Sequence, residues 1–119
     1  MSKRTTFLDE PIKDVCHLRI VISDPDSNNC FLTVPIDSYI SKFQDSSCII
    51  QKGEHPFIKH ISFANYKYAA VLSFQTIFNG IQTRKFIRKQ DVSPELLKKI
   101  QDGAKISKNL NTPAILLSP

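Results

Sequence analysis

The chain has 119 residues, of which 41% are hydrophobic and 23% charged, and its formal net charge is +5. This length suits a single domain over residues 1–119, and the composition excludes collagen-like, coiled-coil and disordered classes. No run approaches the roughly 18 apolar residues of a membrane span, and the first residues contain no apolar signal segment. We therefore expect a cytoplasmic protein with no membrane partner.

Charge is divided unevenly between the two halves of the chain. Residues 1–59 contain seven Lys or Arg against eight Asp or Glu, a net of −1, whereas residues 60–119 contain nine against three, a net of +6. A basic half attracts nucleic acid or an acidic protein segment, although many solvated faces are also rich in lysine. The cysteines, Cys16, Cys30 and Cys48, are odd in number and lie beside apolar residues, which predicts buried, reduced thiols.

Strand signals dominate the first two thirds of the chain. Two runs rich in β-branched residues, 15–23 and 30–36, flank a turn-forming cluster at 24–29. This pattern predicts an antiparallel hairpin. Pro35 marks an edge, a bulge or the end of its strand, because proline cannot donate to a sheet ladder.

Shorter elements are predicted along the rest of the chain. In order they are strands at 48–51 and 68–74, a short helix or a loop at 75–82, and a strand at 84–89. The last of these would carry charge on both faces, which places it at an exposed edge.

Helix signals are strongest near the C-terminus. Ser93 can cap a helix, and Pro94 suits its first position. Gly103 weakens the last turn, and residues 107–119 form a loose tail in which 114–117 could add an edge strand or dock against a partner. The apolar stripe of this helix consists of Leu96, Leu97, Ile100 and Ala104.

This order of elements predicts a mainly β, α+β fold. Residues 15–106 would form a small SH3-like β-barrel of about five to six strands that carries a C-terminal helix. An N-terminal segment, 1–14, precedes it, and Phe7-Leu8 is the candidate there for a first barrel strand. Without that strand the barrel would be open.

A Gly/Pro-rich turn within residues 48–63 holds His55 and His60, two of the three histidines. Histidine exchanges protons near neutrality, so this turn is a candidate acid–base site. The structural alternative is that each ring only bonds backbone groups.

Three segments resemble the MazF/PemK toxin family. Residues 17–23 (His-Leu-Arg-Ile-Val-Ile-Ser) and 32–38 (Leu-Thr-Val-Pro-Ile-Asp-Ser) resemble its second and third strands, and residues 88–100 resemble its final strand and helix. The turn at 53–60 is more similar to a divergent branch of MazF-like proteins. The resemblance implies a MazF-like barrel, commonly a homodimer, that cleaves single-stranded RNA without metal or cofactor. It also implies neutralisation by a cognate antitoxin whose acidic segment lies across the RNA groove.

Two positions depart from the family's catalytic pattern. The family's arginine at the start of the second strand falls on His17, and its catalytic threonine or serine after the third strand falls on Asp37, beside Ser38. We predict that His17 and Asp37 form an oriented imidazole–carboxylate pair, and that His55 or His60 is the second acid or base. This prediction requires the three histidines to converge in one groove.

Candidate RNA-binding residues combine cations, hydroxyl groups and aromatic rings. Cations would steady the phosphate, and Phe57 and Tyr66 are the preferred rings for stacking on bases, although rings in this segment also suit the core. The full set is Arg19, Ser38, Phe57, Lys59, Ser62, Tyr66, Arg84, Lys85 and Arg88.

Other chemistries find weaker support. The histidines with Asp37 or Glu54 could ligate zinc, but the chain has no C-x-x-C or H-x-x-x-H spacing, so no metal is predicted. A serine nucleophile at Ser38 or Ser62 lacks a G-x-S-x-G turn. The alternative function is a non-catalytic barrel that binds nucleic acid or an acidic protein segment through its basic half.

Overall fold

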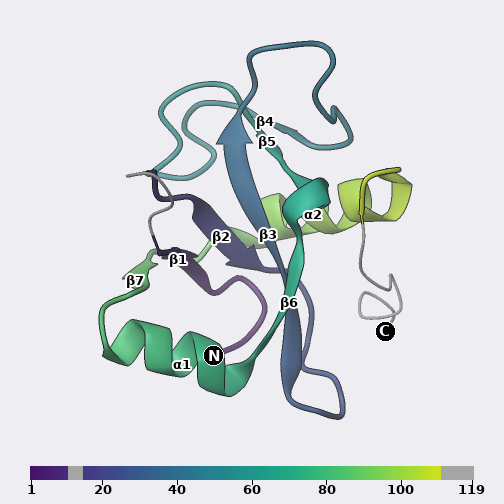
Figure 1. Ribbon diagram of the computed structural model, residues 1–119. Helices are drawn as coiled ribbons and strands as arrows, with labels where there is room; N and C mark the ends of the chain where they lie inside the picture. The colour runs from purple at the N-terminus through teal and green to yellow at the C-terminus, as the bar shows by residue number, and fades with distance from the viewer. Residues whose placement is uncertain (11–14, 111–119) are drawn as a thin grey trace.

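The computed structural model describes residues 1–10 and 15–110. Within these ranges, seven antiparallel strands and two α-helices form an α+β fold, in which the long strand β3 crosses the middle of the sheet (Figure 1). The elements in chain order are β1 (Thr6–Leu8), β2 (Leu18–Val21), β3 (Cys30–Ser38), β4 (Ile49–Ile50), β5 (Ser62–Ala64), the 3₁₀ helix η1 (Tyr66–Tyr68), β6 (Ala70–Ser73), α1 (Phe74–Gln82), β7 (Ile87–Lys89) and α2 (Pro94–Ile106). The predicted strand or docking segment at 114–117 lies outside the described residues.

The strand order is β4-β5-β3-β2-β1-β7, and β6 also pairs with β3. The predicted hairpin is confirmed as β2 and β3, and the segment before it supplies a strand, β1, that pairs with both β2 and β7. The α+β class and the C-terminal helix are confirmed. Among the described residues β4 and β7 lie at opposite ends of the strand order, and the pairings do not close the sheet into a barrel.

Strand β3 organises the sheet because three strands pair with it. On the edge away from β2, β5 pairs with Ile36–Ser38 and β6 pairs with Cys30–Thr33. Pro35 falls between these two pairings, where η1 interrupts the neighbouring strand, and its carbonyl accepts from Asn65 N–H at 2.9 Å. Pro35 therefore lies inside a central strand rather than at its end, at a position where a missing N–H leaves no gap in the ladder.

Both helices begin at a serine cap. The Ser93 hydroxyl accepts from Leu96 N–H at 3.0 Å at the start of α2, and Ser73 caps α1 in the same way. The predicted apolar stripe of α2 is buried in the main core, and the segment left open as a helix or a loop is the helix α1. No helix in residues 1–10 and 15–110 is long and apolar enough to cross a bilayer.

Tyr66 lies in the main core, which corrects its prediction as a base-stacking residue. Its side chain is fully buried, and its hydroxyl donates to the Ile100 carbonyl of α2 at 2.6 Å. Burial raises the pKa of this phenol above its usual range, and burial also raises the pKa of the neighbouring Cys48 thiol to about 11.

All three thiols were predicted to be buried, but only Cys48 is buried. Cys30 is half-buried and Cys16 is exposed.

Gly103 allows α2 to approach this part of the core closely. A Cβ at this position would overlap the Tyr66 hydroxyl and the Cys48 side chain. We expect Gly103→Ala to lower the free energy of unfolding by about 1–2 kcal/mol, because overpacking outweighs the gain in helix propensity. Urea denaturation measures this change. Lys105→Ala, at an exposed position of the same turn, is the control with little expected effect, and a Gly103→Ala protein more stable than the wild type would contradict the close approach.

Candidate active site

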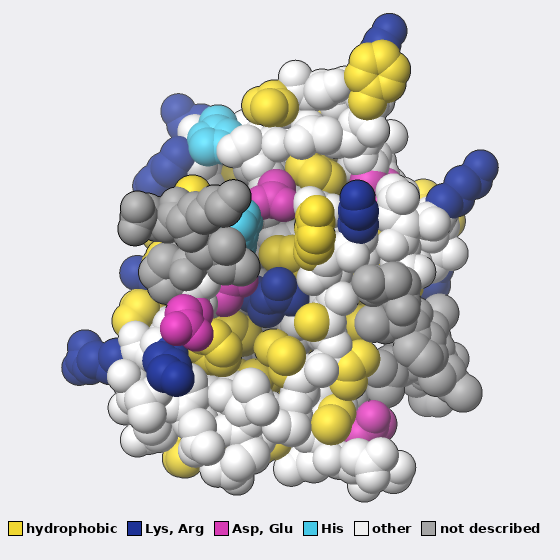
Figure 2. Space-filling model, in the orientation of Figure 1, with side chains coloured by type: hydrophobic (Ala, Val, Ile, Leu, Met, Phe, Trp, Pro, Cys, Tyr) yellow, Lys and Arg dark blue, Asp and Glu magenta, His cyan; other side chains and the backbone are white. Residues whose placement is uncertain are grey.

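Two adjoining hollows lie on the face of the sheet formed by β2 and β3, where Figure 2 shows histidine, acidic and basic side chains gathered together. The first hollow has a volume of about 180 Å³ and the second about 450 Å³. Val15, His17 and Asp37 line both, so these residues form a shared wall between them.

His17 and Asp37 form an ion-pair contact in this shared wall. The register of β2 and β3 pairs Leu18 with Ile36, which brings the residues just beyond them together across the hairpin. His17 Nε2 lies 2.8 Å from Asp37 Oδ1. The other carboxylate oxygen accepts from Asn65 Nδ2 at 2.6 Å. Asp37 is thus held from two sides and fixes the orientation of the imidazole.

The backbone of His17 is also held in place. Its N–H donates to Asp9 Oδ1 at 2.9 Å, and Asp9 N–H donates to the His17 carbonyl at 3.0 Å. Asp9 follows β1 directly, so the pairing of β1 with β2 brings it beside His17. Sequence reasoning missed Asp9 and Asn65. A carboxylate directly after a strand was the available signal for Asp9, and nothing in the local sequence marks Asn65.

A second polar pair lies in the first hollow. Ser38 Oγ and His60 Nε2 share a hydrogen bond of 2.6 Å between the end of β3 and the loop before β5. Lys59 and Ser62 also line this hollow. Lys59 and His60 are exposed, whereas Ser62 is buried and donates its hydroxyl hydrogen to the His60 carbonyl at 2.9 Å. The first hollow therefore combines two imidazoles, a carboxylate and an amine.

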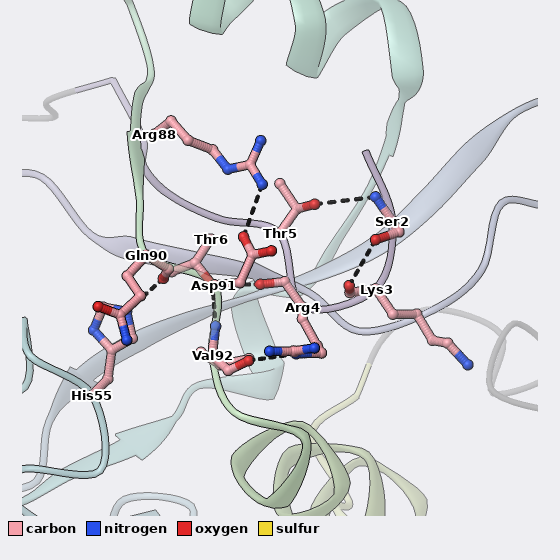
Figure 3. A network of polar contacts seen from close by, with 10 residues as sticks. All are labelled: Ser2, Lys3, Arg4, Thr5, Thr6, His55, Arg88, Gln90, Asp91 and Val92. Carbon is pink, nitrogen blue, oxygen red and sulfur yellow. Dashed lines mark hydrogen bonds and ion pairs between the residues drawn. The ribbon is translucent and has the colours of Figure 1, made fainter.

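His55 lies elsewhere, in the interior of the protein. Its side chain points towards the segment after β7, and Nε2 donates to the Gln90 carbonyl at 2.7 Å (Figure 3). Phe57 N–H donates to its Nδ1 at 3.0 Å. The carbonyl can only accept and the amide can only donate, so the ring is held as the Nε2–H tautomer. The predicted convergence of all three histidines is therefore wrong, because His55 is a structural link and only His17 and His60 line the first hollow.

The segment that receives His55 is itself tied to the N-terminus. Val92 N–H donates to Thr6 Oγ1 at 3.1 Å, and Arg4 Nε donates to the Val92 carbonyl at 2.7 Å (Figure 3). The turn that carries His55 is thus connected through Gln90 to the packing of β1 against β7. These hydrogen bonds stabilise the packing of the His55 turn and the N-terminal strand around β7.

The remaining predicted RNA-binding residues divide into two groups. Phe57 lines the first hollow, and Lys89 Nζ lies 5.5 Å from the centre of its ring. Arg84, Lys85 and Arg88 lie before or in the edge strand β7, are exposed, and line neither hollow. Arg88 also pairs with Asp91 at 2.8 Å. The structure therefore does not bring these three cations to the histidines.

Arg19 lines the second hollow. Its Nε lies 3.4 Å from Asp9 Oδ2, and its Nη1 donates to Thr33 Oγ1 at 3.0 Å. Burial lowers the pKa of Arg19, and the neighbouring carboxylates of Asp9 and Asp37 oppose that shift. An arginine remains a cation near neutral pH.

Among residues 1–10 and 15–110, no three His, Cys, Asp or Glu side chains cluster in a way that could hold a metal ion. No protein-family model matches the chain, and no curated protein or solved structure gives a significant match.

Proposed function

We propose that the protein is a MazF-like endoribonuclease that cleaves single-stranded RNA in the first hollow by metal-independent acid–base chemistry. The observation that supports this proposal is the presence of two oriented imidazoles in one hollow, His17 with Asp37 and His60 with Ser38. A phosphodiester can be cleaved by one base and one acid acting on its two sides.

His17 is the base in this proposal. With its Nε2–H directed to Asp37, the ring carries its lone pair on Nδ1, and this atom accepts the proton of the 2′-hydroxyl. The 2′-oxygen then attacks the phosphorus and forms a new P–O bond. Asp37 stabilises the imidazolium that results, and Asn65 keeps the carboxylate in position.

His60 is the acid. In its protonated form it donates a proton to the 5′-oxygen as the P–O5′ bond breaks, which leaves a 2′,3′-cyclic phosphate and a 5′-hydroxyl. Ser38 Oγ, 2.6 Å from Nε2, orients the ring. The Lys59 amine, on the rim of the same hollow, stabilises the negative charge of the phosphorane.

The proposal is tested by incubating the protein with a mixed single-stranded RNA in EDTA and identifying the ends of the products. We expect fragments with 2′,3′-cyclic phosphate and 5′-hydroxyl ends. DNA of the same sequence, which lacks the 2′-hydroxyl, should stay intact. Intact RNA, or products with 3′-hydroxyl ends, would contradict this chemistry.

The second candidate is a non-catalytic module that binds nucleic acid or an acidic protein segment, such as that of an antitoxin. The exposed Arg84 and Lys85 beside the edge strand β7 favour it, because they supply positive charge away from the hollows. Under this alternative the RNA stays intact, and Lys85→Glu weakens its binding. The first proposal also includes a MazF-like barrel fold, a homodimer, and neutralisation by a cognate antitoxin.

A further inference from the structure

The second hollow is the larger of the two, and the chemistry proposed above assigns no role to the residues that line it alone. Its volume of about 450 Å³ falls in the range of small-ligand sites, roughly 300–1,000 Å³, whereas the first hollow, at about 180 Å³, is below it. Both hollows share the wall that carries His17 and Asp37. A group bound in the second hollow would thus lie directly beside the proposed reaction centre.

Arg19 supplies a fixed set of hydrogen-bond donors in this hollow. Its guanidinium is held by Asp9 and Thr33, and Nη1 also lies 3.4 Å from the Tyr68 carbonyl. Its side chain is only 13% exposed. No described residue accepts a hydrogen bond from Nη2, so within the described structure this nitrogen is the one with donors for a ligand. Because its partners hold the guanidinium in one orientation, Arg19 can select ligands by their acceptor pattern.

Tyr68 supplies an aromatic surface on the same hollow. It is the last residue of η1, its side chain is 59% exposed, and Val15 and Pro35 add apolar lining. An exposed ring beside a cationic group is the usual platform for a base of a single strand. The combination of a ring and a buried arginine fits a planar, polar-edged ligand better than it fits a phosphate alone.

We propose that the second hollow is a nucleobase subsite that binds a guanine next to the cleaved phosphodiester. The guanine ring stacks on Tyr68, and its O6 accepts a hydrogen bond from Nη2 of Arg19. Adenine presents an amino group in place of O6, which would face the guanidinium donor to donor. This inference rests on the proposed function, since the shared wall of His17 and Asp37 places the base beside the phosphate that is cleaved.

The test measures binding of labelled 2′-deoxy heptanucleotides by fluorescence anisotropy. Their central base is guanine, adenine, cytosine or thymine in a constant thymine context, and none can be cleaved because the 2′-hydroxyl is absent. We expect the guanine ligand to bind about tenfold more tightly than the adenine ligand. Tyr68→Ala should weaken binding of all four by about fivefold or more. Guanosine monophosphate should compete better than adenosine monophosphate.

Two further variants complete the test. Arg19→Lys, shown to be folded by its thermal midpoint, should remove the preference for guanine. Phe43→Ala removes a ring that is 89% exposed and lies outside both hollows, and it should leave binding unchanged. Equal affinity for the four ligands, or wild-type binding by Tyr68→Ala, would overturn the subsite.

The outcomes separate this inference from the proposed function. Selective binding of the guanine ligand by a protein that never cleaves RNA would support the subsite and reject the endoribonuclease. Cleavage of RNA without any base preference in binding would reject the subsite alone.

Discussion

Replacing His17 or His60 with alanine is expected to lower the rate of RNA cleavage by about 10²–10⁴-fold in each case. Loss of His17 removes the group that takes the 2′-hydroxyl proton, and loss of His60 removes the group that protonates the leaving oxygen. The double variant should be little worse than the poorer single variant, because the two groups act in one step. Single-turnover cleavage of a defined RNA in EDTA measures all three rates.

The pH dependence of cleavage distinguishes chemistry from a structural effect. The wild type should show a bell-shaped profile, and each single variant should lose one limb of it. Asp37→Asn is the matched positioning variant, since it keeps the shape of the side chain but removes the charge that stabilises the imidazolium. Wild-type cleavage by both His17→Ala and His60→Ala would reject the first hollow as the active site.

Replacing His55 with alanine is expected to reduce the free energy of unfolding by about 2–4 kcal/mol without removing the chemistry. The side chain is only 3% exposed, and its loss leaves the Gln90 carbonyl and the Phe57 N–H without their partner. The space vacated by the buried ring accounts for most of this penalty, and the loss of two partly buried hydrogen bonds adds to it. The thermal midpoint should fall by roughly 10 °C or more.

His60→Ala is the matched control for this second experiment. It makes the same substitution five residues along the same loop, at an exposed position, where the expected change in stability is about 0.5 kcal/mol or less. The two variants should therefore show opposite effects, with lost stability for His55→Ala and lost cleavage for His60→Ala. A His55→Ala protein that is as stable as the wild type but inactive would show that His55 belongs to the catalytic machinery.

Elements with strong local signals were predictable from the sequence. The cap at Ser93, the proline after it and the apolar stripe predicted α2, and two β-branched runs around a turn predicted the hairpin of β2 and β3. Strand β5 was missed because its three residues are too few to show a period. Gly103, interpreted as a weak point in the helix, is instead a point of close packing against Tyr66.

The sequence by itself determined the α+β class, the strand pairing of the hairpin and the C-terminal helix, because caps, turns and hydrophobic periods act over a few neighbouring residues. Only the tertiary structure decided which histidines meet. His55 and His60 stand in one turn, yet one ring is buried against Gln90 and the other contacts Ser38. That difference depends on segments up to 35 residues away in the chain, and no local pattern contains such information. The same long-range pairing placed Asp9 and Asn65 around the pair of His17 and Asp37.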